Sequence, residues 1–170
     1  MTNPPTFEEL FRRCERSAVH LEMRDGYMRS DPAFIDWSRG QVIEPAERWR
    51  TWLDIAKEAT GRGVSVRRAR IVSEPVSDYI RFEHSVTDGL NIKAGEEVGW
   101  LPRQRATALA LPGNDYWVFD DKAALINHFD GAGEALEAEY TEDPHLVSFL
   151  ATSFGAVWKL VVPHTEYRLV

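Results

Sequence analysis

The stretch VSVRRARIVSEPVSDYIRFEH, residues 64–84, predicts a strand followed directly by a helix, and this order decides the fold class. Residues 64–72 have the β-branched composition that is typical of a strand. Side chains two apart on a strand share a face. The two predicted faces consist of Val64, Val66, Arg68, Arg70 and Val72 on one side and of Arg67, Ala69 and Ile71 on the other.

The second part of the stretch predicts a helix that opens near Pro75, with Ser73 as a candidate N-cap and Gly89 near its end. Helical spacing places Val76, Ile80 and Leu90 in one apolar stripe. Glu83 falls within the same stripe, so its carboxylate is expected to face the sheet.

A carboxylate on an apolar helix face and two arginines on the preceding strand allow two interpretations. Burying one charge alone costs several kcal/mol, so a structural salt bridge between strand and helix is the simpler one. In the other, Arg70, Arg81 and Glu83 line a pocket for an anion or a partner beside the free amides at Ser73 and Glu74. The Glu74 side chain could itself occupy that anion position.

Residues 1–62 are predicted to be a helical segment. Thr6 and Glu9 fit a capping box at the start of the first helix. A second helix, around residues 34–37, stops at Gly40, and a third runs over residues 45–61. The apolar face of the first helix is expected to consist of Phe7, Leu10, Phe11, Cys14, Ala18 and Leu21.

Residues 63–170 are predicted to form a mixed sheet with helices. EEVGWLP (96–102) predicts a strand, and DYWVFDD (115–121) and AALINHF (123–129) predict two strands joined by a tight turn. EALEAEY (134–140) fits a strand or a helix. A long last helix begins at Asp143 and Pro144. The expected class is α+β or α/β: N-terminal helices packed on a mixed sheet with a C-terminal helix, in one compact domain overall.

Composition argues against several functions. The chain has 170 residues, 44% of them hydrophobic, and a formal charge of −7, which makes direct binding of nucleic acid unfavourable. Apolar runs stay well below the roughly 20 residues that span a bilayer. The opening MTNPPTFEEL has no pattern of an export signal, and the single cysteine, Cys14, excludes an internal disulfide. A cytoplasmic protein that contacts no membrane is expected.

Known catalytic motifs are missing from the sequence. The five histidines lack zinc-site spacing, so no metal site is expected, and there is no phosphate-binding loop, dinucleotide fingerprint or nucleophile elbow, so no cofactor is expected either. The closing PHTEY, residues 163–167, has two interpretations. It is a strap that packs Tyr167 on the body of the protein, or His164 and Glu166 face a cleft as a proton-handling pair.

Several motifs in the same order resemble a family of uncharacterised actinobacterial proteins that carry a domain of unknown function. The resemblance implies no assigned activity. Members of this family are often encoded near helix-turn-helix regulators, which implies a regulatory or partner-binding role with such a regulator as partner. The motifs are FEELF (7–11), HLEMRDGY (20–27), VSEPVSDYIRFE (72–83), WLPR (100–103), YWVFDD (116–121) and PHTEY (163–167).

The order of elements also resembles one half of a phospholipase D-like protein. That superfamily uses a histidine and a lysine two apart on a strand, followed by an aspartate. Laying YWVFDD on this motif puts Asp120 at the aspartate position, Asp115 where lysine belongs and Gly113 where histidine belongs. The resemblance therefore implies a phosphodiesterase site without its nucleophile, a pseudoenzyme that could still bind a molecule without cutting it.

Three functions follow from these patterns. The favoured one is a non-catalytic intracellular interaction or regulatory module that binds a protein partner or a signal ligand, and a homodimer is compatible with it. An enzyme of unknown type would use Glu83, His164 and Glu166 as acid and base. A small-ligand sensor would use a pocket between the helical part and the sheet. The face expected for the interaction module contains Arg81, Trp100, Arg103 and Tyr116.

Overall fold

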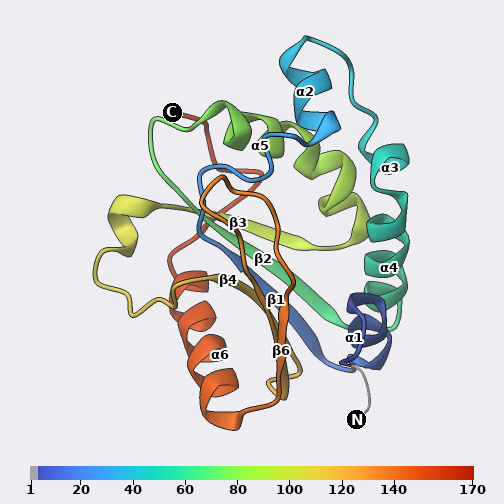
Figure 1. Ribbon diagram of the computed structural model, residues 1–170, viewed down its shortest axis with the longest axis vertical. Coiled ribbons are helices and arrows are strands. Elements are labelled where there is room, and N and C mark those ends of the chain that lie inside the picture. Colours follow the sequence, from blue (N-terminus) through green and yellow to red (C-terminus); the bar gives the residue numbers. More distant parts are fainter. Residues whose placement is uncertain (1–3) are drawn as a thin grey trace.

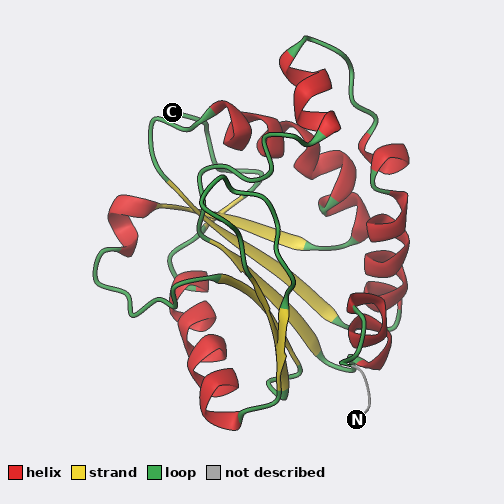
Figure 2. Cartoon of the chain, in the orientation of Figure 1, coloured by secondary structure: helices red, strands yellow, loops and turns green. Residues whose placement is uncertain are grey.

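A seven-stranded mixed sheet forms the centre of the computed structural model (Figures 1 and 2). The structure describes residues 4–170. The stretch MTNPPTFEEL, for which no export signal is predicted, therefore lies partly outside the described residues. The strand order is β6-β5-β4-β1-β2-β3-β7, in which β1, β2 and β3 run parallel and the other neighbours pair antiparallel. The strands are β1 (Ser17–Glu22), β2 (Ser65–Val72), β3 (Glu97–Pro102), β4 (Asp115–Phe119), β5 (Ala123–Asn127), β6 (Glu139–Thr141) and β7 (Val162–Pro163).

Helices cover both faces of this sheet, as expected for a mixed α+β fold. In the part of the chain that the structure describes, no helix is both long and apolar enough to cross a membrane. The helices are α1 (Phe7–Arg13), α2 (Pro32–Ser38), α3 (Pro45–Arg48), α4 (Arg50–Gly61), α5 (Asp78–Leu90) and α6 (Pro144–Trp158), with 3₁₀ turns η1 (Ile92–Ala94) and η2 (Arg103–Ala106).

Strand β1 overturns the prediction of a purely helical segment over residues 1–62. Its six residues lie at the centre of the sheet between β2 and β4. The capping box at Thr6 and Glu9 is confirmed, but α1 ends at Cys14. There the Asp120 carboxylate accepts hydrogen bonds at 2.7–2.9 Å from the backbone N–H groups of residues 15–17, which turns the chain into the strand.

The apolar residues whose spacing predicts one long helix are buried in the structure, but the last of them lie on strand β1. Ala18 belongs to the apolar cluster of α1 and α4, whereas Leu21 belongs to the cluster under α6. Three residues apart on a strand, the two side chains point to opposite faces. Both positions are apolar because both faces of β1 are buried. Apolar residues at spacings of three or four therefore do not distinguish a strand that is buried on both faces from a helix.

Two helix boundaries also differ from the prediction. The helix expected over residues 45–61 is divided at Trp49, whose φ of −118° and ψ of 41° leave the helical region. Helix α5 begins with Ser77 as N-cap, not near Pro75. Ser73 does not cap it, because the helix begins five residues further on; the Ser73 backbone N–H and hydroxyl instead donate to the Asp25 carboxylate at 2.6 Å.

The C-terminal predictions are confirmed. The turn between β4 and β5 contains Asp120 and Asp121 at φ of 54° and 56°, the left-handed region in which aspartate is tolerated. Helix α6 begins with Asp143 as N-cap and Pro144 in its first turn. The ambiguous stretch at residues 134–140 ends in the short strand β6.

The two sides of the sheet are covered by different helices (Figure 1). Helix α6 packs on one side, where Ala69 and Ile71 of β2 join an apolar cluster with its side chains. Helices α1, α4 and α5 lie on the other side, where Arg68 and Arg70 are buried. The predicted alternation of β2 is therefore confirmed, and the charged side chains lie on the side that α5 covers.

Candidate functional site

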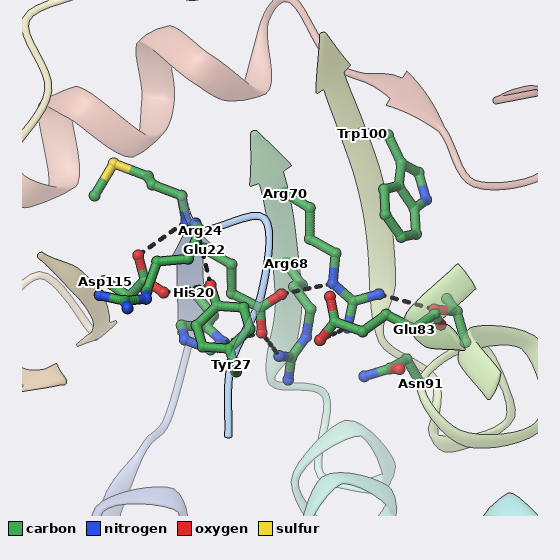
Figure 3. A network of polar contacts seen from close by, with 12 residues as sticks. His20, Glu22, Arg24, Tyr27, Arg68, Arg70, Glu83, Asn91, Trp100 and Asp115 are labelled. Carbon is green, nitrogen blue, oxygen red and sulfur yellow. Dashed lines mark hydrogen bonds and ion pairs between the residues drawn. The ribbon is translucent and has the colours of Figure 1, made fainter. Parts of the chain in front are cut away.

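Glu22, the last residue of β1, is the centre of a buried ionic network (Figure 3). It lies beside β2, and its carboxylate accepts hydrogen bonds from Arg68 Nη1 and, at 2.5 Å, from Arg70 Nε. Arg68 Nε donates to Glu96 at 2.7 Å, and Glu96 also accepts from Asn91. These four charged side chains are buried, so their mutual hydrogen bonds offset the cost of removing them from water.

Glu83 of α5 adds a second carboxylate, which is less well neutralised. Its Oε1 lies 3.7 Å from Arg70 Nη2, so the predicted ion pair between strand and helix is confirmed. Arg70 donates its hydrogen bonds elsewhere, to Glu22 and to Thr87 Oγ1. Glu83 Oε2 is buried without a hydrogen-bond partner among the described residues. Burial, with a smaller contribution from the charge of Glu22, raises the pKa of Glu83 to about 7 against the attraction of Arg70.

Asp115, the first residue of β4, supplies a third carboxylate. Its Oδ1 accepts from the backbone N–H of Met23 at 2.8 Å, and its Oδ2 accepts from the Tyr27 hydroxyl. Burial raises the pKa of Asp115 to about 6, and the charge of Glu22 adds to the increase. Burial and the neighbouring carboxylates hold the pKa of Tyr27 well above its ordinary value, so the phenol remains a hydrogen-bond donor.

His20 lies two residues before Glu22 on the same face of β1. Only 6% of it is exposed, and its ring stacks on Trp117 with 4.2 Å between ring centroids. Its Nδ1 lies 3.4 Å from Glu22 Oε1 but makes no hydrogen bond within the described residues. Burial, and then the charge of Arg68, hold the pKa of His20 well below its ordinary value, so the imidazole is neutral.

These groups surround a cavity of about 190 Å³ between the loop after β1, helix α5 and strands β1, β4 and β5. In Figure 3 the side chains of Glu22, Glu83 and Tyr27 extend from these elements toward one region. A cavity that is partly open to solvent and contains several carboxyl groups of perturbed pKa is a typical functional-site candidate. It is lined by His20, Glu22, Tyr27, Met28, Tyr79, Glu83, Asp115, Asn127 and Phe129.

The face predicted for partner binding does not exist as a surface. Trp100 and Tyr116 are both 0% exposed, and they lie on opposite sides of the sheet. Tyr116 donates its hydroxyl hydrogen to the Leu150 carbonyl at 2.8 Å. Arg103 holds loops together, with hydrogen bonds to Ser73 Oγ and to two backbone carbonyls. Arg81 alone of the four is partly exposed without a described polar contact.

The anion pocket predicted at Ser73 and Glu74 is not formed either. Helix α5 begins at Asp78, four residues after Glu74, and the Ser73 amide already donates to Asp25. Glu74 accepts a hydrogen bond from the Tyr167 hydroxyl at 2.8 Å. Tyr167 is buried and stacks on Trp100 with 5.4 Å between centroids, so the strap interpretation of PHTEY is confirmed.

The predicted acid and base residues are not assembled into one site. His164 is buried, and its Nδ1 accepts a hydrogen bond from Trp100 Nε1 at 3.0 Å. Its Nε2 lies 3.4 Å from the exposed carboxylate of Asp88. Glu166 is exposed, and neither it nor Glu83 is a polar partner of His164 within residues 4–170. Only Glu83 of the three lines the cavity.

The positions taken from the phospholipase D-like motif are likewise separated. Asp115 begins β4 and lines the cavity, whereas Asp120 follows the other end of the same strand. There Asp120 fixes the entry into β1 through backbone hydrogen bonds. No group of three or more His, Cys, Asp or Glu side chains in the described part of the chain is arranged to hold a metal ion.

Comparison with other proteins agrees with this fold. Residues 5–169 match the family model of DUF6879, a domain of unknown function, and the chain belongs to this family. None of the curated proteins matches the chain. Nuc, a phospholipase D family member from Salmonella typhimurium, is similar in structure with a TM-score of 0.51 and 11% identity, over 95% of this chain and 88% of that one. The sheet and its helices therefore have a phospholipase D-like fold.

A second solved structure is similar over less of its own length. It is TrmBL2, an archaeal chromatin protein whose structure is described as showing a novel mode of DNA binding. The TM-score is 0.49 and the identity 12%, and the match covers 91% of this chain. The chain spans 47% of the length of TrmBL2.

Proposed function

We propose that this protein is a non-catalytic binding module with a regulatory role in the cytoplasm, and that a small signal ligand occupies the cavity beside Glu83. One observation carries the proposal: two buried carboxyl groups, Glu83 and Asp115, face a cavity with pKa values raised to about 7 and about 6. An arrangement that disfavours ionisation of its own groups costs stability, and such arrangements cluster at functional sites.

A binding role is supported over phosphodiester hydrolysis by the residues at the motif positions. Gly113 and Asp115 stand where the superfamily has its histidine and lysine, so the nucleophile and the cation are both lacking. A phospholipase D-like fold whose catalytic residues are replaced is a pseudoenzyme in this proposal, and its cleft binds without cutting.

The proposed protein partner is a helix-turn-helix regulator, following the resemblance to an actinobacterial family encoded near such regulators. Burial of Trp100 and Tyr116 removes them from any partner surface. Arg81 on α5 remains a partly exposed cation on the helix that also carries Glu83. A ligand in the cavity and a partner on the outer side of α5 would contact the same helix, which provides a physical route for a regulatory response.

An acid-base enzyme is the second candidate. The observation in its favour is that two carboxyl groups with pKa values near neutrality lie at one cavity, as general acids and bases require. In this candidate Asp115 takes the place of His164 and Glu166 as the partner of Glu83, because Asp115 lines the cavity and neither His164 nor Glu166 does.

Metabolite depletion separates the two candidates. The purified protein is mixed with a small-molecule extract of its host, and metabolites are quantified by mass spectrometry over time. A binding module removes at most one equivalent of its ligand per protein chain and releases it unchanged on denaturation. An enzyme converts many equivalents and a product accumulates, which would contradict the proposal.

Variants locate the effect within the molecule. Glu83→Gln is expected to abolish depletion, whereas Glu166→Gln, an exposed carboxylate outside the cavity, serves as the matched control and is expected to leave it unchanged. For the regulator, affinity capture with wild type beside Arg81→Ala is expected to recover a helix-turn-helix protein with wild type only. Equal recovery with both would exclude this face of α5.

A further inference from the structure

We propose that the cavity beside Glu83 binds a small organic cation with a single positive charge, an alkylammonium or a guanidinium group, which pairs with the Glu83 carboxylate next to Asp115. This inference rests on the proposed binding function and adds the chemical class of the ligand. Four features of the cavity support a cation: its charge, its unpartnered polar atoms, its aromatic walls and its size.

The charge around the cavity is unbalanced toward the negative side. The hydrogen bonds of the two buried guanidinium groups go mainly to Glu22 and Glu96. Glu83 retains only a contact of 3.7 Å to Arg70, which is too long for a hydrogen bond. Asp115 accepts from two neutral donors, the Met23 amide and the Tyr27 hydroxyl, and the nearby charge of Arg24 lowers its pKa only against the larger effect of burial. A cation in the cavity would supply the missing charge.

Two buried polar atoms at the cavity have no hydrogen-bond partner within the described chain. One is Glu83 Oε2, an acceptor when the carboxylate is ionised. The other is Nδ1 of His20, a side chain that is more than nine-tenths buried. Buried polar groups are paired in most native structures, and an exception calls for a bound molecule or a functional role. Glu83 Oε2 can accept from a donor that enters the cavity.

Aromatic rings form the remaining walls. Tyr27 lies 5.8 Å from Tyr79 and 5.3 Å from Phe129, measured between ring centroids. The Arg24 guanidinium lies over the Phe129 ring at 4.8 Å, so this ring already takes part in a cation–π contact. Aromatic faces combined with carboxylates are the usual way in which proteins recognise alkylated ammonium groups.

The size and the surroundings of the cavity favour one charge on a short chain. Its volume of about 190 Å³ is below the roughly 300–1,000 Å³ of pockets for drug-sized ligands. An adjoining cavity that shares Tyr27 is lined by Arg24 and Arg29. Their charges would repel a second ammonium group, so a monocation is preferred over a diamine of the same length.

The test is a thermal-unfolding series on the full chain at pH 8, where Glu83 is ionised. The probes are n-butylammonium and n-butylguanidinium, the neutral n-butanol, the anionic butyrate and the dication of 1,4-diaminobutane, at matched ionic strength. The monocations are expected to raise the Tm by about 5 °C or more at one hundred times their Kd. Calorimetry is expected to give one site per chain, with the diamine binding more weakly.

Two variants tie binding to the cavity. Glu83→Gln and Asp115→Asn are each expected to weaken binding of the monocations by about tenfold or more, since each removes one charge from the site. Glu166→Gln is expected to bind as the wild type does. Two substitutions at separate elements keep the test valid if one variant folds poorly, which circular dichroism detects.

Each of the other possible outcomes would contradict one part of the inference. Equal stabilisation by butanol or butyrate would overturn the cation and leave a binding pocket. Binding that survives in both cavity variants would overturn the site, and a diamine that binds more tightly than the monoamine would overturn the single charge. If none of the probes binds to the wild type, the cation inference fails, while the metabolite-depletion experiment still decides the proposed function by itself.

Discussion

On the α6 side of the sheet, Ala69 and Ile71 of β2 lie in a continuous apolar core, whereas on the α5 side Arg68 and Arg70 of the same strand lie in a network of buried charges. The apolar side needs only shape complementarity. The charged side needs specific partners from three elements, and replacing such a network by apolar residues is often neutral or stabilising by about 1–4 kcal/mol. Stability alone therefore does not explain the charged side, which is also the side that contains the candidate site.

The largest loss of stability is expected from a substitution on the charged side of the sheet. Glu22→Ala leaves both buried guanidinium groups without their shared acceptor, and breaking a buried ion pair in this way costs about 3–5 kcal/mol. Urea unfolding measures the loss. Glu97→Ala, which breaks an exposed pair with Arg67, is the control and is expected to cost under about 1 kcal/mol. Similar losses for both would mean that water reaches the Glu22 network.

A comparable but simpler loss is expected on the apolar side. Leu150→Ala on α6 removes a side chain that is almost completely buried in the apolar core and is expected to cost about 2–5 kcal/mol. Phe149→Ala, on the adjacent exposed position of the same helix, is the control and is expected to cost far less. Binding at the cavity is expected to be unchanged in Leu150→Ala. A loss of binding would show that the two sides of the sheet are coupled.

Glu83→Gln is expected to stabilise the protein, by about 2–3 kcal/mol at pH 8. The pKa of Glu83 is raised to about 7 in the folded protein, so the native state binds more protons than the unfolded chain between about pH 4.5 and 7. Stability therefore falls as the pH rises through this window, and the variant removes that fall. Unfolding free energies at pH 4.5 and pH 8 check this. A variant that is less stable at pH 8 would show that Arg70 neutralises Glu83.

The smallest expected effect is the difference in lost stability between two tyrosine-to-phenylalanine variants. Tyr27→Phe deletes a donor to the Asp115 carboxylate and is expected to cost about 1.5–3 kcal/mol, because hydrogen bonds to charged groups are the stronger ones. Tyr116→Phe deletes a donor to the Leu150 carbonyl and is expected to cost about 0.5–1.5 kcal/mol. Equal losses in chemical denaturation would indicate that Asp115 is protonated in the folded protein, so that Tyr27 donates to a neutral group.

Local patterns were enough to predict much of the fold. The alternation of residues 64–72, the turn at Asp120 and the N-cap at Asp143 depend on neighbouring residues, and the structure confirms all three. The pair of Arg70 and Glu83 was predictable for the same reason, since strand and helix follow one another in the chain.

The centre of the site was not predictable in this way. Glu22 was not predicted as a site residue, because residues 17–22 continue the apolar spacing of a helix. Its two partners, Arg68 and Arg70, lie more than forty residues further along the chain. The pairing of Tyr27 with Asp115 joins residues 88 positions apart and has no local signal. Trp100 and Tyr116 were assigned to a surface because composition does not distinguish a buried aromatic residue from an exposed one. The unbroken run DYWVF, buried at every position, is the signal that argues for a core strand.

The position of β1 also determines how the chain can fold. Strand β1 is synthesised before its neighbour β4, and the Ser17 backbone N–H donates to Asp120, which lies 103 residues further along. Such long-range pairing slows folding, because the loop must close before the contacts form. Until then one edge of β1 stays open, and its His20 and Glu22 side chains are of the polar kind that discourages pairing with other chains. The same two side chains line the cavity of the folded protein.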